Sequence, residues 1–319
     1  MSCLSEFNLS SSDGKSRLHI MQWLPDDRNV KAVLQLAHGV TEHIGRYDTF
    51  ARFMANNGFA VIGNSHLGHG RSAATEEDLG FFTEKGGWDF AVRDLHLVFE
   101  SARAKFPGLP YFLLGHSMGS FLTRTFLTRY QNILSGCIIS GTGQPAAALI
   151  HVGLLLSSVQ KLLYGARKQS AALNLLCFGA YNRRVNPLRT PCDWLTRDVD
   201  LVDRFIADNT CGFVPTVGLF SDLLGGIQFV GRKKNIAHMQ KDLPILFVSG
   251  DQDPVGDFGF GVRKVQRLFT AAGLDDVTVK MYQGARHEVL NETIRQDVFN
   301  DILDWLLAKL SKDKKKAAP

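Results

Sequence analysis

The ten residues YFLLGHSMGS, at positions 111–120, place an apolar run directly before a serine that lies between two glycines. Residues 111–114 have the pattern of a buried strand, and apolar or aromatic residues follow at helical spacing in residues 119–130. The stretch predicts a strand, a sharp turn and a helix, with Ser117 at the turn. A serine at such a turn is either a nucleophile or a hydroxyl group with a local role, and this context favours the nucleophile.

Short apolar runs alternate with helical patterns along much of the chain. Six runs are predicted to be strands buried on both faces, at residues 31–39, 59–64, 111–117, 136–140, 244–250 and 277–282. Amphipathic helices are predicted within residues 47–58 and 89–108, which end in the stop signals Asn-Asn-Gly and Pro-Gly. The alternation predicts an α/β fold with a mostly parallel central sheet flanked by helices.

The alternation stops at residues 146–242, where leucine-rich helical segments follow one another without a strand. We predict that these residues form a helical cap inserted into a core built from residues 1–145 and 243–311. The insertion carries twelve Lys or Arg against seven Asp, a balance of +5. Residues 312–319 contain four lysines and are predicted to form a disordered, solvated basic tail.

The composition argues against several protein classes. The N-terminus has no apolar segment after a basic start, so no secretory signal is predicted and a cytoplasmic location is expected. Glycine, glutamine and proline interrupt residues 134–160, which favours a strand and a separate helix over a bilayer span. The five cysteines never form a C-x-x-C pair and no H-E-x-x-H motif occurs, so we expect no disulfide framework, metal site or cofactor. The formal charge of +5 is modest, and no nucleic-acid partner is expected.

A serine hydroxyl becomes an effective nucleophile only when a base takes its proton and a carboxylate orients that base. In folds where the nucleophilic serine lies at a turn between a strand and a helix, the acid and then the histidine follow the serine along the chain. The run at 244–250 is followed by three candidate acids, Asp251, Asp253 and Asp257. The run at 277–282 is followed by one histidine, His287, which is therefore the expected base.

The segment AHGVTEHIGRY, at residues 37–47, follows a predicted strand and begins with a His-Gly pair typical of an oxyanion loop. The backbone N–H groups of Val40 and Met118 are expected to stabilise the negative oxygen of a tetrahedral intermediate. Glu42 and Arg46 are four residues apart and are expected to pair across a helical turn, and His43 is expected to buttress the loop.

Five motifs together resemble a known family: HGVTEHIGRY (38–47), HLGHGRS (66–72), GHSMGS (115–120), GDQDPVG (250–256) and GARHEVLNE (284–292). Their order and spacing are similar to those of the α/β-hydrolases called the monoacylglycerol lipase and lysophospholipase family. The resemblance implies that Ser117 is the nucleophile, Asp253 the acid and His287 the base. It also implies that Val40 and Met118 supply the oxyanion hole.

The resemblance includes cap segments such as CFGAYNRRV (177–185), and it departs from the family at Asn64, where relatives often carry an aspartate. It implies a serine hydrolase that cleaves carboxylic esters of monoacyl lipids without a cofactor. The cap is expected to make peripheral contact with membranes or micelles. The alternatives are a carboxylesterase, thioesterase or acyltransferase of the same fold, and a catalytically silent binding protein. Four residues are expected to contact the substrate: His38, Gly39, His116 and Leu155.

Overall fold

The structure is a computed structural model that describes residues 2–26 and 29–316. Eight strands form one sheet: β1 (Cys3–Ser10), β2 (Arg17–Leu24), β3 (Ala32–Ala37), β4 (Phe59–Asn64), β5 (Tyr111–His116), β6 (Gly136–Ser140), β7 (Ile245–Gly250) and β8 (Val277–Tyr282). Their order across the sheet is β1-β2-β4-β3-β5-β6-β7-β8. The pairs β1–β2 and β2–β4 are antiparallel, and all the others are parallel.

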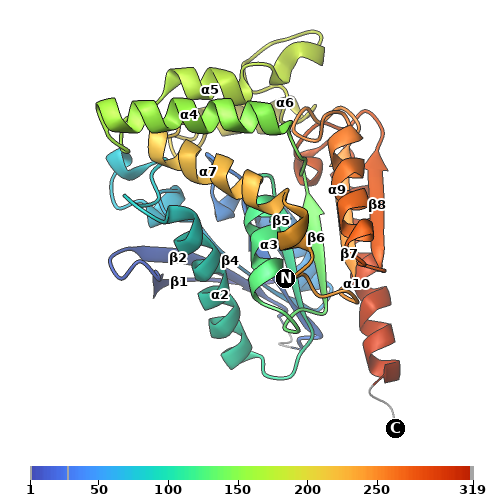
Figure 1. The fold of residues 1–319 in the computed structure, drawn as a ribbon. Helices are drawn as coiled ribbons and strands as arrows, with labels where there is room; N and C mark the ends of the chain where they lie inside the picture. Colours follow the sequence, from blue (N-terminus) through green and yellow to red (C-terminus); the bar gives the residue numbers. More distant parts are fainter. Residues whose placement is uncertain (1, 27–28, 317–319) are drawn as a thin grey trace.

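Helices cover both faces of the sheet (Figure 1). One layer consists of α1 (Asp48–Asn56) and α10 (Arg295–Lys316), whose apolar side chains share a buried cluster with one face of the strands. The other layer consists of α2 (Gly87–Lys105), α3 (Met118–Arg129) and α9 (Phe260–Ala271), which contribute to the larger cluster on the opposite face. Every residue of β3 to β7 is buried, as expected for parallel strands covered on both sides. The predicted fold class is therefore confirmed.

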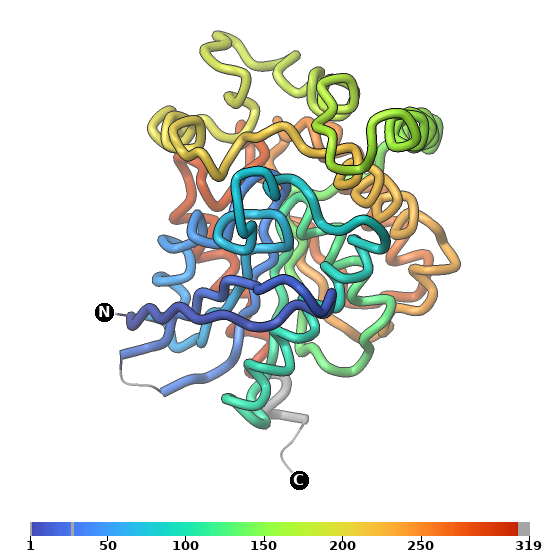
Figure 2. The backbone as a smooth tube through the Cα atoms, turned by 90° about the vertical axis from the view of Figure 1, so that its left-hand side faces the viewer, coloured from blue at the N-terminus to red at the C-terminus, as the bar shows by residue number. Residues whose placement is uncertain are grey.

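All six predicted strands are present, but β8 is not buried on both faces as predicted: it is an edge strand whose residues alternate between half-buried and exposed along most of its length. The sequence pattern also did not predict the N-terminal hairpin of β1 and β2. In Figure 2 this hairpin lies at the near edge of the molecule, below the cap segments. β1 is an edge strand whose side chains alternate between exposed and half-buried. An edge strand of this kind lacks the continuous apolar run from which the buried strands were recognised.

Five α-helices lie between β6 and β7 in the sequence, and the first of them lie above the carboxyl ends of the parallel strands (Figure 1). They are α4 (Ala147–Tyr164), α5 (Ala171–Phe178), α6 (Val199–Ala207), α7 (Val217–Val230) and α8 (Lys233–Ile236). α7 is the most buried of the five, and it packs between α4 on one side and the core helices α2 and α3 on the other. At Gly226 an added Cβ would lie 2.2 Å from the Trp88 ring of α2, so this close packing requires glycine.

The C-terminal helix and residues 134–160 can be compared with two further predictions, the disordered tail and the absence of a bilayer span. α10 continues through Lys316, so residues 312–316 are helical where a disordered tail was expected, and residues 317–319 lie outside the described part of the chain. Lysine has a good intrinsic helix propensity, so a run of lysines can continue a helix. Residues 134–160 contain β6 and part of α4, as predicted, although α4 alone is long and apolar enough to cross a membrane.

Candidate active site

Ser117 lies at the sharp turn between β5 and α3, with φ of 51° and ψ of −119°. A non-glycine residue adopts such a positive φ only when the surrounding structure enforces it. The flanking glycines allow the close packing, because an added Cβ would lie 2.3 Å from Thr123 Oγ1 at Gly115 and 2.0 Å from the Ala37 carbonyl oxygen at Gly119. This turn directs the serine side chain away from the sheet, and Ser117 lines the cavity beneath the cap.

His287 lines this cavity, and Asp253 contacts the histidine from the side away from the cavity. Asp253 follows β7 and His287 follows β8, and His287 Nδ1 lies 2.9 Å from Asp253 Oδ1. The two side chains are 2% and 0% exposed. Burial opposes a charge on the imidazole, but the adjacent carboxylate outweighs it and raises the pKa of His287. The pair has the arrangement of a base oriented by an acid.

The other two candidate acids lie elsewhere. Asp251 Oδ1 accepts a hydrogen bond from the Gly284 N–H at 2.8 Å, so this carboxylate joins two loops rather than contacting the histidine. Asp257 lines the cavity at a positive φ of 47°. Among the three candidates, the contact with His287 belongs to Asp253.

The cavity has a volume of about 620 Å³ and lies between the core and the cap. Ser117, His287, Val40 and Met118 all line it, and Met118 is the first residue of α3. The first N–H groups of a helix have no acceptor within the helix, so they are suited to bind a negative oxygen. Much of the remaining wall is apolar and comes from the cap: Leu149, Ile150, Leu176, Phe178, Leu223, Leu224 and Ile227.

Two of the four predicted substrate contacts line the cavity, and two do not. Gly39 and His116 are lining residues. His38 is fully buried behind the wall, where its Nε2 accepts a hydrogen bond from the His66 N–H at 2.8 Å. Leu155 is 68% exposed on the outer side of α4. It is five residues from the cavity-lining Ile150, which places it about 140° around the helix.

A buried ionic network connects the oxyanion loop to the residue after His287. Arg46 donates to Glu42 at 2.5 Å, as the sequence spacing predicts, and it also forms two hydrogen bonds of 2.7 Å with Glu288. Glu42 Oε1 accepts a hydrogen bond from the Gly39 N–H at 2.5 Å. Burial opposes ionisation of Glu288, but Arg46 outweighs this effect and lowers its pKa to about 2. Burial raises the pKa of Glu42, which shares the same guanidinium.

Two neighbours of His287 were not predicted from the sequence. The Trp194 ring lies with its centroid 4.9 Å from that of His287, and the His287 N–H donates to the Trp194 carbonyl oxygen at 3.4 Å. The next backbone N–H, from Glu288, donates to the Leu195 carbonyl oxygen at 2.7 Å. The cap residues 194 and 195 therefore help to position the loop that carries His287. A tryptophan in a long insertion has no local pattern that would indicate this role.

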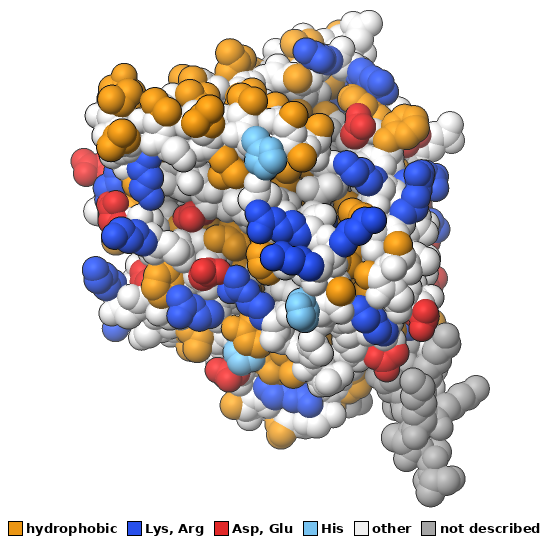
Figure 3. All heavy atoms as spheres, viewed as in Figure 1, with side chains coloured by type: hydrophobic (Ala, Val, Ile, Leu, Met, Phe, Trp, Pro, Cys, Tyr) orange, Lys and Arg blue, Asp and Glu red, His pale blue; other side chains and the backbone are white. Residues whose placement is uncertain are grey.

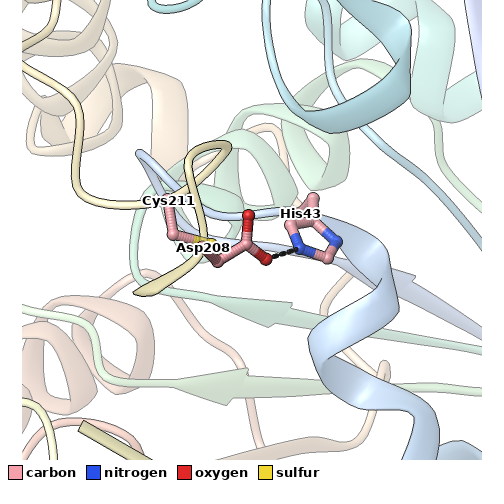
Figure 4. Close-up of side chains that lie close together, drawn as sticks. All are labelled: His43, Asp208 and Cys211. Carbon is pink, nitrogen blue, oxygen red and sulfur yellow. Dashed lines mark hydrogen bonds and ion pairs between the residues drawn. The ribbon is translucent and has the colours of Figure 1, made fainter. Parts of the chain in front are cut away.

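Within the described residues, one group of three side chains brings potential metal ligands together: His43, Asp208 and Cys211 (Figure 4). His43 Nε2 lies 2.9 Å from Asp208 Oδ2, while His43 Nδ1 accepts a hydrogen bond from the Gly45 N–H at 3.1 Å. Burial raises the pKa of the Cys211 thiol, which favours its protonated form. Since both ring nitrogens of His43 are already used, the group acts as a link between the oxyanion loop and the turn after α6. His43 thus buttresses the loop, as expected.

Comparisons with known proteins agree with this fold. The sequence profile of the family described as serine aminopeptidase, S33, matches residues 28–294. A monoacylglycerol lipase from Mycolicibacterium smegmatis is 29% identical over 292 residues, covering 90% of this chain and 92% of the relative. The monoglyceride lipase of Homo sapiens is 27% identical over 303 residues, covering 94% and 89% of the two chains.

Solved structures show the same similarity. A highly thermostable carboxyl esterase from Bacillus coagulans has a TM-score of 0.90 at 27% identity, with 97% of this chain and 99% of that chain covered. A monoglyceride lipase from Saccharomyces cerevisiae shares the fold, with a TM-score of 0.76 at 19% identity and coverage of 96% and 94%. Together with the lipase relatives, these similarities make the protein a serine ester hydrolase. The chain belongs to the serine aminopeptidase S33 family, as an α/β-hydrolase of the monoacylglycerol lipase type.

Proposed function

We propose that this enzyme hydrolyses the carboxylic esters of monoacyl lipids, with Ser117 as nucleophile, His287 as base and Asp253 as the orienting acid. The observation that carries the proposal is the cavity of about 620 Å³, in which Ser117 and His287 lie beneath a largely apolar wall from the cap. An apolar pocket that ends at a few polar groups fits a single acyl chain with a reactive ester at one end.

The proposed chemistry assigns one role to each of these groups. His287 takes the proton of Ser117 as the serine oxygen attacks the ester carbonyl, and Asp253 stabilises the imidazolium that forms. The N–H groups of Val40 and Met118 bind the oxyanion. The alcohol leaves with the proton from His287, and water then hydrolyses the acyl-enzyme by the same route. Gly39 and His116, which line the cavity, are proposed to contact the substrate.

We also propose that the outer side of α4 rests on lipid aggregates. Its exposed apolar side chains form a row along the top of the molecule in Figure 3, and they include Leu155 at 68%, Leu162 at 86% and Leu163 at 63% exposure. A contiguous apolar patch of this kind is typical of an interface with membranes or micelles. Peripheral contact is favoured over a bilayer span, because Ile150 and Gly153 on the other side of α4 are buried in the protein.

A hydrolysis panel tests the proposed substrate class. Long-chain monoacylglycerols and lysophospholipids are expected to be cleaved with a higher kcat/KM than acetyl esters or acyl-CoA. Ser117→Ala is expected to abolish hydrolysis of every substrate and labelling by a fluorophosphonate probe, while circular dichroism remains unchanged. A preference for acetyl esters would refute the lipid assignment, and preferred cleavage of acyl-CoA would make the enzyme a thioesterase. Residual activity above a few per cent in Ser117→Ala would refute the role of the serine.

A further inference from the structure

A second, smaller pocket of about 110 Å³ lies next to the catalytic cavity, and Tyr181 lines both. Three arginines, two carboxamide residues and no acidic residue line it within the described part of the chain. Two of the arginines, Arg184 and Arg197, come from the cap, and Arg286 comes from the core. A small polar pocket with several guanidinium groups has the chemistry of an anion site.

Each arginine is held in place by a contact that leaves donors free. The Arg184 guanidinium lies over the Phe258 ring, 3.6 Å from its centroid. Arg286 Nη1 donates to the carbonyl oxygens of Asp193 at 2.6 Å and Thr196 at 3.1 Å. A guanidinium has five N–H donors in a rigid fork, so these contacts fix the groups without using all of their donors.

Arg197 gives an independent indication of a ligand. Its Nε donates to the buried carboxylate of Glu292 at 2.9 Å, whereas its Nη2 is buried without a hydrogen-bond partner. A buried donor without a partner is costly, so native structures usually satisfy it with protein, water or a ligand. At Gly284 an added Cβ would lie 2.9 Å from Arg197 Nη1, so the glycine leaves room for this guanidinium.

The charge balance also favours an anion. Among the described residues, Arg197 forms an ion pair with Glu292, but neither Arg184 nor Arg286 has a carboxylate within ion-pair distance. Two positive charges therefore face a small pocket without a protein counter-ion. An oxyanion with several acceptor oxygens would neutralise them and accept hydrogen bonds from more than one guanidinium.

The pocket lies directly behind the loops that carry the acid and the base. Gln252 and Phe258 line it from the loop of Asp253, and Gly284 and Arg286 line it from the loop of His287. The cap contributes Tyr181, Arg184, Val185, Asn186 and Arg197. An occupant would thus contact the cap and both catalytic loops at once.

We propose that this pocket binds an oxyanion of the phosphate class, either free phosphate or the phosphate of a lipid headgroup, through Arg184, Arg197 and Arg286. The anion would bridge the cap and the two loops. The site does not depend on the substrate proposed above, because binding is measured without turnover.

The test is a titration of the purified enzyme with inorganic phosphate, with sodium chloride keeping the ionic strength constant. Saturable heat release in calorimetry and a saturable rise in Tm are expected, since a ligand that binds the folded state stabilises it. The Ser117→Ala variant is expected to bind phosphate like the wild type, which separates this site from catalysis. A response that does not saturate, or an equal response to chloride alone, would overturn the proposal.

Two variants locate the site. Arg184→Ala is expected to weaken phosphate binding by about 10- to 100-fold, the loss typical of hydrogen bonds to charged groups. Arg183→Ala removes the adjacent exposed arginine, which does not line the pocket, and is expected to bind phosphate normally. Arg197 is left intact because its loss would leave the buried Glu292 carboxylate unpaired. Unchanged binding in Arg184→Ala, or equal losses in both variants, would overturn the assignment.

The source of the phosphate is distinguished by competition. If the pocket holds a lipid headgroup, inorganic phosphate is expected to inhibit hydrolysis of a lysophosphatidic acid competitively and to spare a monoacylglycerol of the same chain. If it holds free phosphate, both substrates respond alike. Either result supports an oxyanion site, provided that the response is lost in Arg184→Ala and kept in Arg183→Ala.

Discussion

Replacing Arg46 by methionine is expected to destabilise the enzyme by about 3–5 kcal/mol at neutral pH, the range for removing one partner of a buried ion pair. The guanidinium is 12% exposed, and the carboxylates of Glu42 and Glu288 are 4% and 5% exposed, so water offers little screening. Methionine fills a similar volume but leaves two neighbouring carboxylates without a cation. Glu42 would keep its bonds from Gly39 and Tyr47, and Glu288 would keep one from Asn291.

The loss of stability is expected to depend on pH. In the wild type the pKa of Glu288 lies at about 2, below its unfolded value of about 4.3, so the ion pair stabilises the protein above that unfolded value and is lost as the pH falls through about 2. Without Arg46, burial would raise the pKa of this carboxyl group, which then favours its protonated form. The difference in stability between wild type and Arg46→Met is therefore expected to be largest at neutral pH. It is expected to narrow first as the pH falls through the raised pKa of the variant, and further below about pH 4, where the wild type loses its ion pair.

Urea denaturation followed by circular dichroism measures this difference. The matched control is Arg52→Met, which breaks an exposed pair with Asp48, 41% and 39% exposed, and is expected to cost about 1 kcal/mol or less. Adding Glu288→Gln to Arg46→Met removes one unpaired charge and is expected to recover part of the loss. The reasoning is refuted if Arg46→Met is no more destabilising than Arg52→Met, or if the second substitution recovers nothing.

Three further outcomes are expected. Asp253→Asn should lower kcat by about 10⁴-fold on a p-nitrophenyl ester, and Asp251→Asn much less; the reverse order would reassign the acid. The kcat/KM of the wild type should fall as the pH is lowered, because only the neutral His287 ring accepts a proton. Burial lowers the pKa of His287 but Asp253 raises it more, so the midpoint should lie above the ordinary histidine value of 6.5, and a midpoint below 6.5 would contradict this. Leu155→Glu and Leu162→Glu should reduce turnover of micellar monoacylglycerol and spare p-nitrophenyl acetate, and equal losses on both substrates would argue against an interfacial role for α4.

The parallel core was predictable because its signals are local. Each strand from β3 to β7 is a buried run, and the glycines around Ser117 mark a turn that only small neighbours permit. Asp253 and His287 could be chosen as neighbours because both follow strands at the same edge of a parallel sheet. The choice among three acids depended on the family resemblance, since Asp251 and Asp253 lie only two residues apart.

The cap was less predictable because its packing is set by distant partners. The leucine-rich pattern of α4 indicated a helix, but it did not distinguish Ile150, which lines the cavity, from Leu155, which lies outside. A helix with apolar residues on most sides has no clear buried face in its sequence. His38 was predicted to contact the substrate, but its ring is buried behind the cavity wall. Its position in the oxyanion loop sequence does not determine on which side of the cavity wall the ring lies.

The ionic network shows how a correct local prediction can miss its larger consequence. The pair of Glu42 and Arg46 was expected from their spacing, as a contact across one helical turn, and such pairs usually contribute little. Arg46 has a second partner, Glu288, which lies 242 residues further along the chain. Because of this contact the Arg46 guanidinium bridges the oxyanion loop and the loop of His287. Arg46 also lies over the Phe205 ring of α6, 4.7 Å from its centroid. The buried Arg46 guanidinium thereby contacts the oxyanion loop, the loop of His287 and α6, and its removal is expected to disturb the positions of all three.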